Sequence, residues 1–408
     1  MKNKVWGIMM KRNSNSELDK NNTDISTKEK RKSIDFKALA NMDLGTLNVK
    51  LSKSLKKINK LSTPEKKRKV IAFDMGSSTI KIVEGMYYKN DLVIDKYITI
   101  PTPKDAIIDG EIKKEEELYG KLSQILKQNG IKTKDATCTT NSTLIINREI
   151  LIPKVEDEEM DTVVRYEIQQ YLPINLEDYI LQVTILGDEE VNETKKLNVR
   201  VIAYPEKIAR GYYNILLKLN LKPYALDVNY NAVNKFSNFT GINSEFEHNS
   251  RDSVAFIDMG ASAIDVNIYK DGNLDFTRII KDCGNDIDEI LQRSGVKASE
   301  VVDFKIKNIN LKEELDPLNI DVRYVIDDWI EKIEKIIQFY KNRNTENEVN
   351  KIIIFGGSSK INGMEEYMTE KLGIKTKING TTKIAFKSKD DGKPVDDFIN
   401  AIGSVIRV

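Results

Sequence analysis

The sequence contains very few of the residues that most often carry catalysis or bind transition metals. Among its 408 residues there is one histidine, His248, in a polar loop, and there are two cysteines, Cys138 and Cys283. A Ser-His-Asp hydrolase needs a placed imidazole, and zinc sites use histidine or clustered cysteine, so both classes are excluded. Two isolated cysteines provide no disulfide framework. We expect His248 to be a solvated loop residue.

Long apolar runs are lacking as well. No run approaches the roughly 18 residues required to cross a bilayer. The apolar stretch near the N-terminus is short and has no small-residue cleavage site. With 40% apolar and 31% charged residues, the composition is that of a globular protein. We therefore expect a cytoplasmic protein, and its 408 residues predict more than one lobe.

Charge is unevenly distributed along the chain. Residues 1–69 contain 19 basic and 7 acidic residues, a net charge of +12, whereas the remainder carries −11. We expect this basic arm to be largely disordered, except that apolar residues at helical spacing between lysines in residues 50–61 predict a short amphipathic helix. Two interpretations stay open: docking on an anionic membrane surface, or a solvated tail helix. Nucleic-acid binding is not expected, because no aromatic residues alternate with these lysines.

The rest of the chain is organised around residues 70–83, where two apolar runs flank Asp-Met-Gly-Ser-Ser. This pattern predicts a strand, a tight turn and a second strand. Its glycine allows close backbone approach, its hydroxyl and N–H groups can bind phosphate, and its aspartate can hold a hydrated magnesium ion. Residues 254–266 repeat the pattern around a second Asp-Met-Gly. Two such hairpins, one in each half, indicate a two-lobed nucleotide clamp.

The intervening and following segments alternate between strands and amphipathic helices. Helical spacing of apolar residues predicts helices at 115–128, 156–172 and 325–343. A buried strand at 351–355 ends in Gly-Gly-Ser before another helix begins. A strand followed by a double glycine and a helix start lets a ligand approach backbone N–H groups.

These motifs, in this order, resemble the two phosphate motifs and the adenosine motif of the actin-like ATPases, which include actin, heat-shock chaperones, sugar kinases and the division protein FtsA. The resemblance implies an α/β fold with two lobes, each of ribonuclease-H-like architecture, and an inserted small α+β subdomain. Within this superfamily, residues 164–179 are similar to the E-x-x-x-Y-[IL]-P-x-x-x-E-[ED] segment of the PilM family of type IV pilus assembly proteins. Three further segments also resemble that family: 201–206, 221–227 and 337–340.

The resemblance implies a binding site for ATP or ADP with Mg²⁺. The first phosphate loop would be formed by Asp74, Gly76, Ser77, Ser78 and Lys81, and the second by Asp258, Gly260, Ser262 and Asp265. Gly356, Gly357 and Ser358 would contact adenosine, and Gly284 and Asn285 would lie near the nucleotide. The three aspartates Asp74, Asp258 and Asp265 would hold magnesium through water.

One departure from the superfamily pattern concerns catalysis. Several of these families have Glu or Gln just before the second phosphate motif, where it orients the attacking water, and here Asn229 occupies that place. Asparagine cannot act as a carboxylate base, although it can hold a water. With Asp258 and Asn229 as the only catalytic candidates, we predict nucleotide binding with slow or negligible hydrolysis.

The resemblance implies a scaffold at the cytoplasmic face of the membrane that recruits the cytoplasmic N-terminus of a PilN-like protein. Two alternatives remain: an FtsA-like polymer-forming protein and a small-molecule kinase of the same superfamily. The implied domains are the basic arm (1–69), lobe I (70–135 and 205–252), the insert (136–204) and lobe II (253–408).

Overall fold

A computed structural model describes one unit of the chain that begins after the basic arm. The described ranges are 67–156, 159–172, 174–191, 194–241, 252–313, 315–378, 387–388 and 395–407. The amphipathic helix expected at 50–61 and the loop histidine His248 lie outside these ranges. Within the described residues, none of the helices has the length and apolar character needed to span a membrane.

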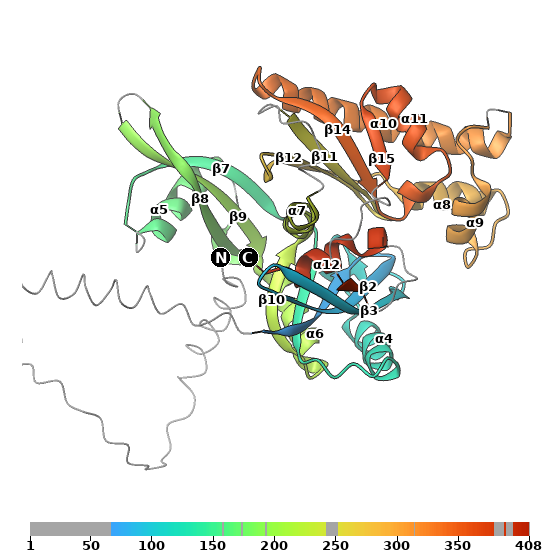
Figure 1. Ribbon diagram of the computed structural model, residues 1–408, viewed down its shortest axis with the longest axis horizontal. Helices are drawn as coiled ribbons and strands as arrows, with labels where there is room; N and C mark the ends of the chain where they lie inside the picture. Colours follow the sequence, from blue (N-terminus) through green and yellow to red (C-terminus); the bar gives the residue numbers. More distant parts are fainter. Residues whose placement is uncertain are drawn as a thin grey trace, which may run out of the picture. The chain divides into compact units, whose positions relative to one another are not determined.

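Lobe I is built on a six-stranded sheet in the order β10-β6-β1-β2-β3-β16; Figure 1 labels its strands β10, β2 and β3. The first three strands form an antiparallel meander, and β6 and β10 then add in parallel beside β1. The strands are β1 (Lys69–Met75), β2 (Thr79–Tyr88), β3 (Asp91–Pro101), β6 (Asp135–Thr140), β10 (Lys222–Val228) and β16 (Lys387–Ser388). Its helices are α4 (Glu115–Gln128), α6 (Glu206–Lys218) and α7 (Asn229–Thr240), and a short hairpin joins β4 (Ile107–Ile108) to β5 (Glu111–Ile112).

Lobe II repeats this topology with a five-stranded sheet in the order β13-β12-β11-β14-β15. Again an antiparallel meander comes first, and two parallel strands follow on the other side of the first strand. The strands are β11 (Asp252–Met259), β12 (Ile264–Lys270), β13 (Asn273–Ile280), β14 (Glu348–Phe355) and β15 (Lys375–Ile378). The helices are α8 (Gly284–Arg293), α9 (Val301–Asn308), α10 (Pro317–Arg343) and α11 (Met364–Leu372).

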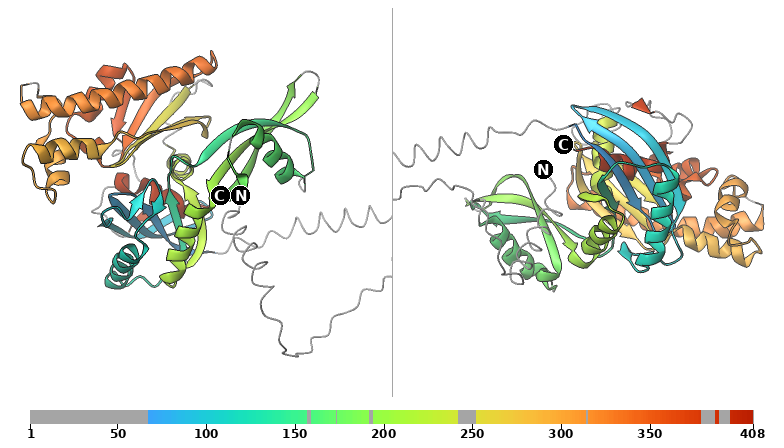
Figure 2. Two further views of the ribbon diagram at one scale, coloured as in Figure 1. Left: turned by 180° about the vertical axis from the view of Figure 1, so that it is seen from behind. Right: turned by 90° about the horizontal axis from the view of Figure 1, so that it is seen from below.

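Helix α10 provides one side of the lobe II core (Figure 2). Its apolar stripe, including Trp329 and Ile333, is buried against the apolar face of the sheet. The helix begins at Pro317, earlier than the start predicted at residue 325. Asp316 caps it by accepting a hydrogen bond from the backbone N–H of Asn319 (2.9 Å), and proline suits the first helical position.

The insert is a three-stranded antiparallel sheet, in the order β7-β9-β8, covered by α5. Its elements are β7 (Ile146–Pro153), α5 (Met160–Tyr171), β8 (Tyr179–Val191) and β9 (Thr194–Pro205). The structure corrects the boundary expected at residue 136. Strand β6 pairs with β1 and β10, so it belongs to the lobe I sheet, and the insert starts with β7.

A second correction concerns the C-terminal end of the chain, which the sequence predicts to lie in lobe II. Helix α12 (Ile399–Val405) returns to lobe I, where it packs on α7 and on β1, β2 and β6 (Figure 1). The two helices cross closely at Gly403, because a Cβ atom there would lie 2.0 Å from the carbonyl oxygen of Ala232. The hydroxyl of Ser404 also donates to the hydroxyl of Thr137 in β6 (2.9 Å).

Candidate functional site

The two Asp-Met-Gly turns have the same local geometry. In each, the glycine N–H donates to the carbonyl three residues later, from Gly76 to Thr79 at 3.2 Å and from Gly260 to Ala263 at 3.0 Å. A Cβ atom would come within 2.6 Å of that carbonyl oxygen at Gly76 and within 2.8 Å at Gly260. Both turns therefore require glycine, and each leaves its aspartate at the end of the preceding strand.

These turns face one cavity of about 410 Å³, which is lined by residues of both lobes. Thirteen of the predicted residues line it: Asp74, Gly76, Ser77, Ser78, Lys81, Asn229, Asp258, Gly260, Ser262, Asp265, Gly356, Gly357 and Ser358. Two predicted residues do not. Gly284 and Asn285 lie behind the second turn, where their N–H groups donate to the carbonyls of Gly260 (3.2 Å) and Ala261 (2.9 Å). They hold the second turn in place by these two hydrogen bonds.

Three carboxylates gather at the centre of this cavity. Burial raises the pKa of Asp74 to about 6, an effect that Lys81 opposes and the charge of Asp258 increases. Burial together with Asp258 raises the pKa of Asp265 to about 7. Burial also raises the pKa of Asp258. Because carboxylates crowded in a low dielectric repel one another, this cluster favours a cation beside it.

The geometry does not make these aspartates a complete metal site. Among the described residues, no three His, Cys, Asp or Glu side chains are placed to ligate a metal ion directly. The donor set nevertheless suits Mg²⁺, which keeps several waters and needs only one or two carboxylates besides phosphate oxygens. Any magnesium ion here would therefore be held largely through water.

Asn400, which the sequence analysis missed, joins the two lobes at this cluster. It lies on α12 and is 3% exposed. Its amide donates to the carboxylate of Asp258 (3.1 Å), with a second, longer contact to Asp74 (3.5 Å). Its carbonyl oxygen is buried without a hydrogen-bond partner among the described residues. In the sequence, the sign of this role is that Asn400 is the one amide side chain in a helix whose other residues are apolar or small.

The cavity wall also contains a buried ion pair that the sequence did not predict. The ammonium group of Lys305, a residue only 5% exposed, donates to Asp288 (2.7 Å) and to the carbonyl of Gly284 (3.1 Å). Both side chains line the cavity, as does Ser358. A lysine on a short helix carries no pattern that distinguishes it from a solvated lysine.

Gly356 and Gly357 have different local requirements. Gly356 has a φ of +93°, and a Cβ atom there would lie 2.5 Å from a carboxylate oxygen of Asp258. Gly357 has ordinary helical angles, and an added Cβ would meet no atom within 4 Å. The fold therefore requires glycine at position 356 but not at position 357.

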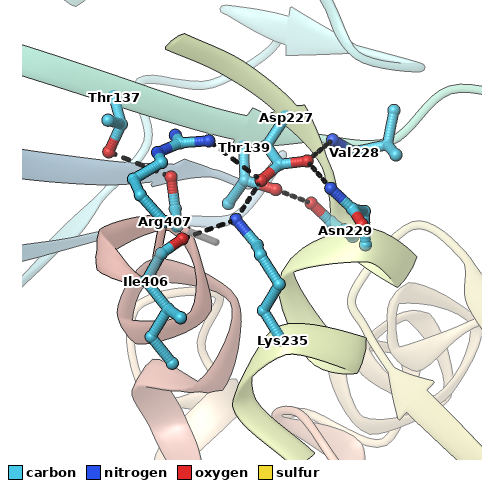
Figure 3. Close-up of polar contacts among 10 residues, drawn as sticks. Thr137, Thr139, Asp227, Val228, Asn229, Lys235, Ile406 and Arg407 are labelled. Atoms are coloured by element: carbon cyan, nitrogen blue, oxygen red, sulfur yellow. Dashed lines mark hydrogen bonds and ion pairs between the residues drawn. The ribbon is translucent and has the colours of Figure 1, made fainter. Parts of the chain in front are cut away.

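Asn229 begins α7 and lines the cavity, and its side-chain oxygen accepts a hydrogen bond from the hydroxyl of Thr139 (3.0 Å) (Figure 3). Its remaining side-chain group is an NH₂, which can only donate. The neighbouring carboxylate, Asp227, is held by Lys235 at 2.5 Å and by Arg407 at 3.7 Å (Figure 3). Burial opposes the ionisation of Asp227, but these two cations outweigh it and lower its pKa. No free carboxylate base lies at this position.

Duplicated sheets, paired Asp-Met-Gly turns and a Gly-Gly turn around one cavity define the two-lobed actin-like ATPase fold, as the sequence predicted. The family model for "Type IV pilus assembly protein PilM" matches residues 72–396. The chain therefore belongs to the PilM family. This result favours the assembly-protein interpretation over the FtsA-like and kinase alternatives.

One solved structure supports the fold. The chain is similar to one in the PilM–PilN type IV pilus biogenesis complex, with 19% identity, a TM-score of 0.70, and coverage of 82% of this chain and 97% of the other. Ethanolamine utilization protein EutJ from Carboxydothermus hydrogenoformans matches with 12% identity, a TM-score of 0.48, and coverage of 88% and 98%. MreB5 of Spiroplasma citri bound to ADP matches with 15% identity, a TM-score of 0.44, and coverage of 76% and 91%.

Proposed function

We propose that this chain is a nucleotide-binding scaffold of type IV pilus assembly, and that it binds ATP or ADP with Mg²⁺ in the cavity between its lobes. One observation carries the proposal: both Asp-Met-Gly turns and the Gly356-Gly357 turn line the same cavity. Turns of this kind present backbone N–H groups to phosphate oxygens. The volume of about 410 Å³ lies within the usual range for small-ligand pockets.

Each wall of the cavity has its own role in this proposal. The N–H and hydroxyl groups of Ser77, Ser78 and Ser262 donate to phosphate oxygens, and Lys81 adds a positive charge. The nucleoside lies toward Gly356, Gly357 and Ser358, near the Lys305–Asp288 pair. Gly284 and Asn285 act indirectly, by holding the second turn in place.

The aspartates hold Mg²⁺ through water. Burial and mutual repulsion raise the pKa values of Asp74 and Asp265, and a cation relieves both effects. The unpaired carbonyl oxygen of Asn400 provides a further acceptor for a coordinated water. A bound magnesium ion neutralises negative charge on the phosphates.

Hydrolysis is slow or negligible. The cavity residue at the position of a catalytic carboxylate is Asn229, and Asp227 beside it is engaged by two cations. A turnover assay with purified protein tests this point. Rates of about 1 to 100 per second, typical of kinases, would contradict it.

The scaffold's partner is the cytoplasmic N-terminus of a PilN-like membrane protein. The chain therefore acts at the cytoplasmic face of the membrane, and its residues 1–69 can contact anionic lipid there. Support comes from membership of the PilM family and from the similarity to the chain of the PilM–PilN complex. The test is fluorescence anisotropy with a labelled peptide of the PilN N-terminus encoded in the same genome. Saturable binding that changes with nucleotide supports the proposal, and absence of binding with and without ATP contradicts it.

A further inference from the structure

Three arginines from separate elements come together at the edge of lobe II. Arg278 lies on β13, the edge strand of the lobe II sheet, and Arg343 is the last residue of α10. Arg148 lies on β7, the edge strand of the insert sheet. All three side chains are exposed. Arg278 and Arg343 both lie over the ring of Phe276, and the charges of Arg148 and Arg343 add to the effect of partial burial in lowering the pKa of Arg278.

Two phenylalanine rings lie beneath two of these charges, those of Arg278 and Arg343. The guanidinium of Arg278 lies 4.6 Å from the ring centroid of Phe276 and 5.9 Å from that of Phe339, and Arg343 lies 5.4 Å from Phe276. The two rings are 5.6 Å apart. Phe276 is buried, whereas Phe339 is 52% exposed. The surface therefore combines positive charge with open aromatic area.

The positive charge of this surface is not compensated locally. Within the ranges that the structure describes, Arg148, Arg278 and Arg343 have no carboxylate within ion-pair distance, unlike Arg293, which pairs with Glu289 at 3.1 Å. Nearby carboxylates have other partners. Asp275 accepts a hydrogen bond from the hydroxyl of Tyr340 (2.8 Å), and Glu149 pairs with Arg200.

We propose that these arginines and Phe339 form a docking surface for an acidic segment of a partner protein, in which carboxylates flank an apolar side chain. A guanidinium binds a carboxylate through two parallel hydrogen bonds, and arginine and aromatic residues contribute strongly to protein interfaces. The chain from residue 70 onward carries a net charge of −11. Residues from 70 onward would repel a broad anionic surface, such as a lipid bilayer or duplex DNA, brought against these arginines, so any attraction to such a surface would come from the basic residues 1–69. A short acidic segment contacts only the arginine surface.

The test compares two charge-matched variants of the full chain. R148Q/R278Q/R343Q removes the three clustered charges, and R293Q/K297Q/K307Q removes three exposed charges in the α8–α9 segment that have local carboxylate partners. The probe is a fluorescent peptide in which glutamates flank one phenylalanine, with a glutamine version as its control. Vesicles containing phosphatidylserine and a duplex DNA are measured in parallel.

We expect the first variant to bind the acidic peptide roughly tenfold more weakly than the wild type, and the second to bind it as the wild type does. F339A, which leaves every charge in place, should weaken binding as well. Equal losses in both triple variants, or no loss in the first, would overturn the proposal. So would binding of vesicles or DNA through the three arginines without binding of the peptide. Thermal unfolding of each variant checks the fold, and R343Q alone provides the same comparison if the triple variant unfolds.

Discussion

The hydroxyl oxygens of Ser77 and Ser262 lie 2.7 Å apart, although 185 residues separate them in the chain. Each serine stands at the tip of an Asp-Met-Gly hairpin, one from each lobe. The two Asp-Met-Gly turns therefore meet directly, and a ligand bound in the cavity beside them would contact both lobes at once. A change in the angle between the lobes would first alter the contact between Ser77 and Ser262.

Replacing Gly357 by alanine should separate ligand binding from stability. The added methyl group meets no protein atom within 4 Å, so we expect the free energy of unfolding to stay within about 1 kcal/mol of the wild type. The methyl group occupies cavity space, however, and should weaken ATP binding by roughly tenfold. Chemical denaturation and nucleotide titration measure the two effects. G356A is the matched comparison, because its positive φ and its contact with Asp258 predict a loss of about 1 to 3 kcal/mol.

Replacing Asn229 by aspartate should increase ATP hydrolysis. The change restores a carboxylate at the cavity wall without changing side-chain size, and general-base catalysis contributes about 10²- to 10⁴-fold. We expect a rise of at least roughly tenfold in steady-state phosphate release. This expectation lies below the full contribution of a general base, because the surrounding side chains are not arranged to position the new carboxylate for catalysis. N229A, which removes the side chain without adding a base, serves as the control. A rate unchanged in N229D would mean that this position does not limit hydrolysis.

Replacing Asp265 by asparagine should stabilise the ligand-free protein in a pH-dependent way. The folded-state pKa of Asp265, about 7, exceeds the unfolded value near 4. Between pH 4 and pH 7 the folded state therefore binds more protons than the unfolded state, and the stability of the wild type falls as the pH rises through this range. D265N removes that loss and should gain about 1 to 3 kcal/mol near pH 8, with little gain near pH 5. Urea denaturation across this range measures it. A gain that does not depend on pH would contradict the assignment, and Mg²⁺-dependent nucleotide binding should weaken in the same variant.

Replacing Lys235 by methionine should destabilise the junction of α7 with the C-terminal segment. Of the two cations that pair with the buried carboxylate of Asp227, it leaves only the more distant Arg407, at 3.7 Å. It also removes a hydrogen bond from Lys235 to the carbonyl of Ile406 (3.0 Å). We expect a loss of about 3 to 5 kcal/mol at neutral pH in denaturant unfolding. The double variant D227N/K235M should recover part of it, and a K235M protein as stable as the wild type would show that the ion pair contributes little.

The hairpins and the Gly-Gly turn could be predicted because their signals are local. Alternating apolar residues mark β1 and β2, and a turn that excludes a Cβ atom requires glycine at Gly76 and Gly260. The same reasoning predicts the buried stripe of α10 but not its start. Asp316 and Pro317 contribute nothing to the apolar periodicity, because they act at the helix start as the N-cap and the first helical residue.

Contacts between distant segments could not be predicted in this way. Asn400 approaches Asp74 across 326 positions, and nothing in residues 399–405 indicates which lobe α12 covers. For the same reason β6 was placed in the insert, since its neighbours β1 and β10 are distant in the sequence. The partnership of Lys305 with Asp288 likewise depends on the packing of α9 against α8.

The most direct test of the nucleotide clamp is a calorimetric titration of the purified chain with ATP, carried out with Mg²⁺ and again with EDTA. We expect saturable one-to-one binding with Mg²⁺, weaker binding with EDTA, and a matching loss in G357A while its stability is retained. Absence of binding at saturating ATP and Mg²⁺, in a protein that unfolds cooperatively, would contradict the account.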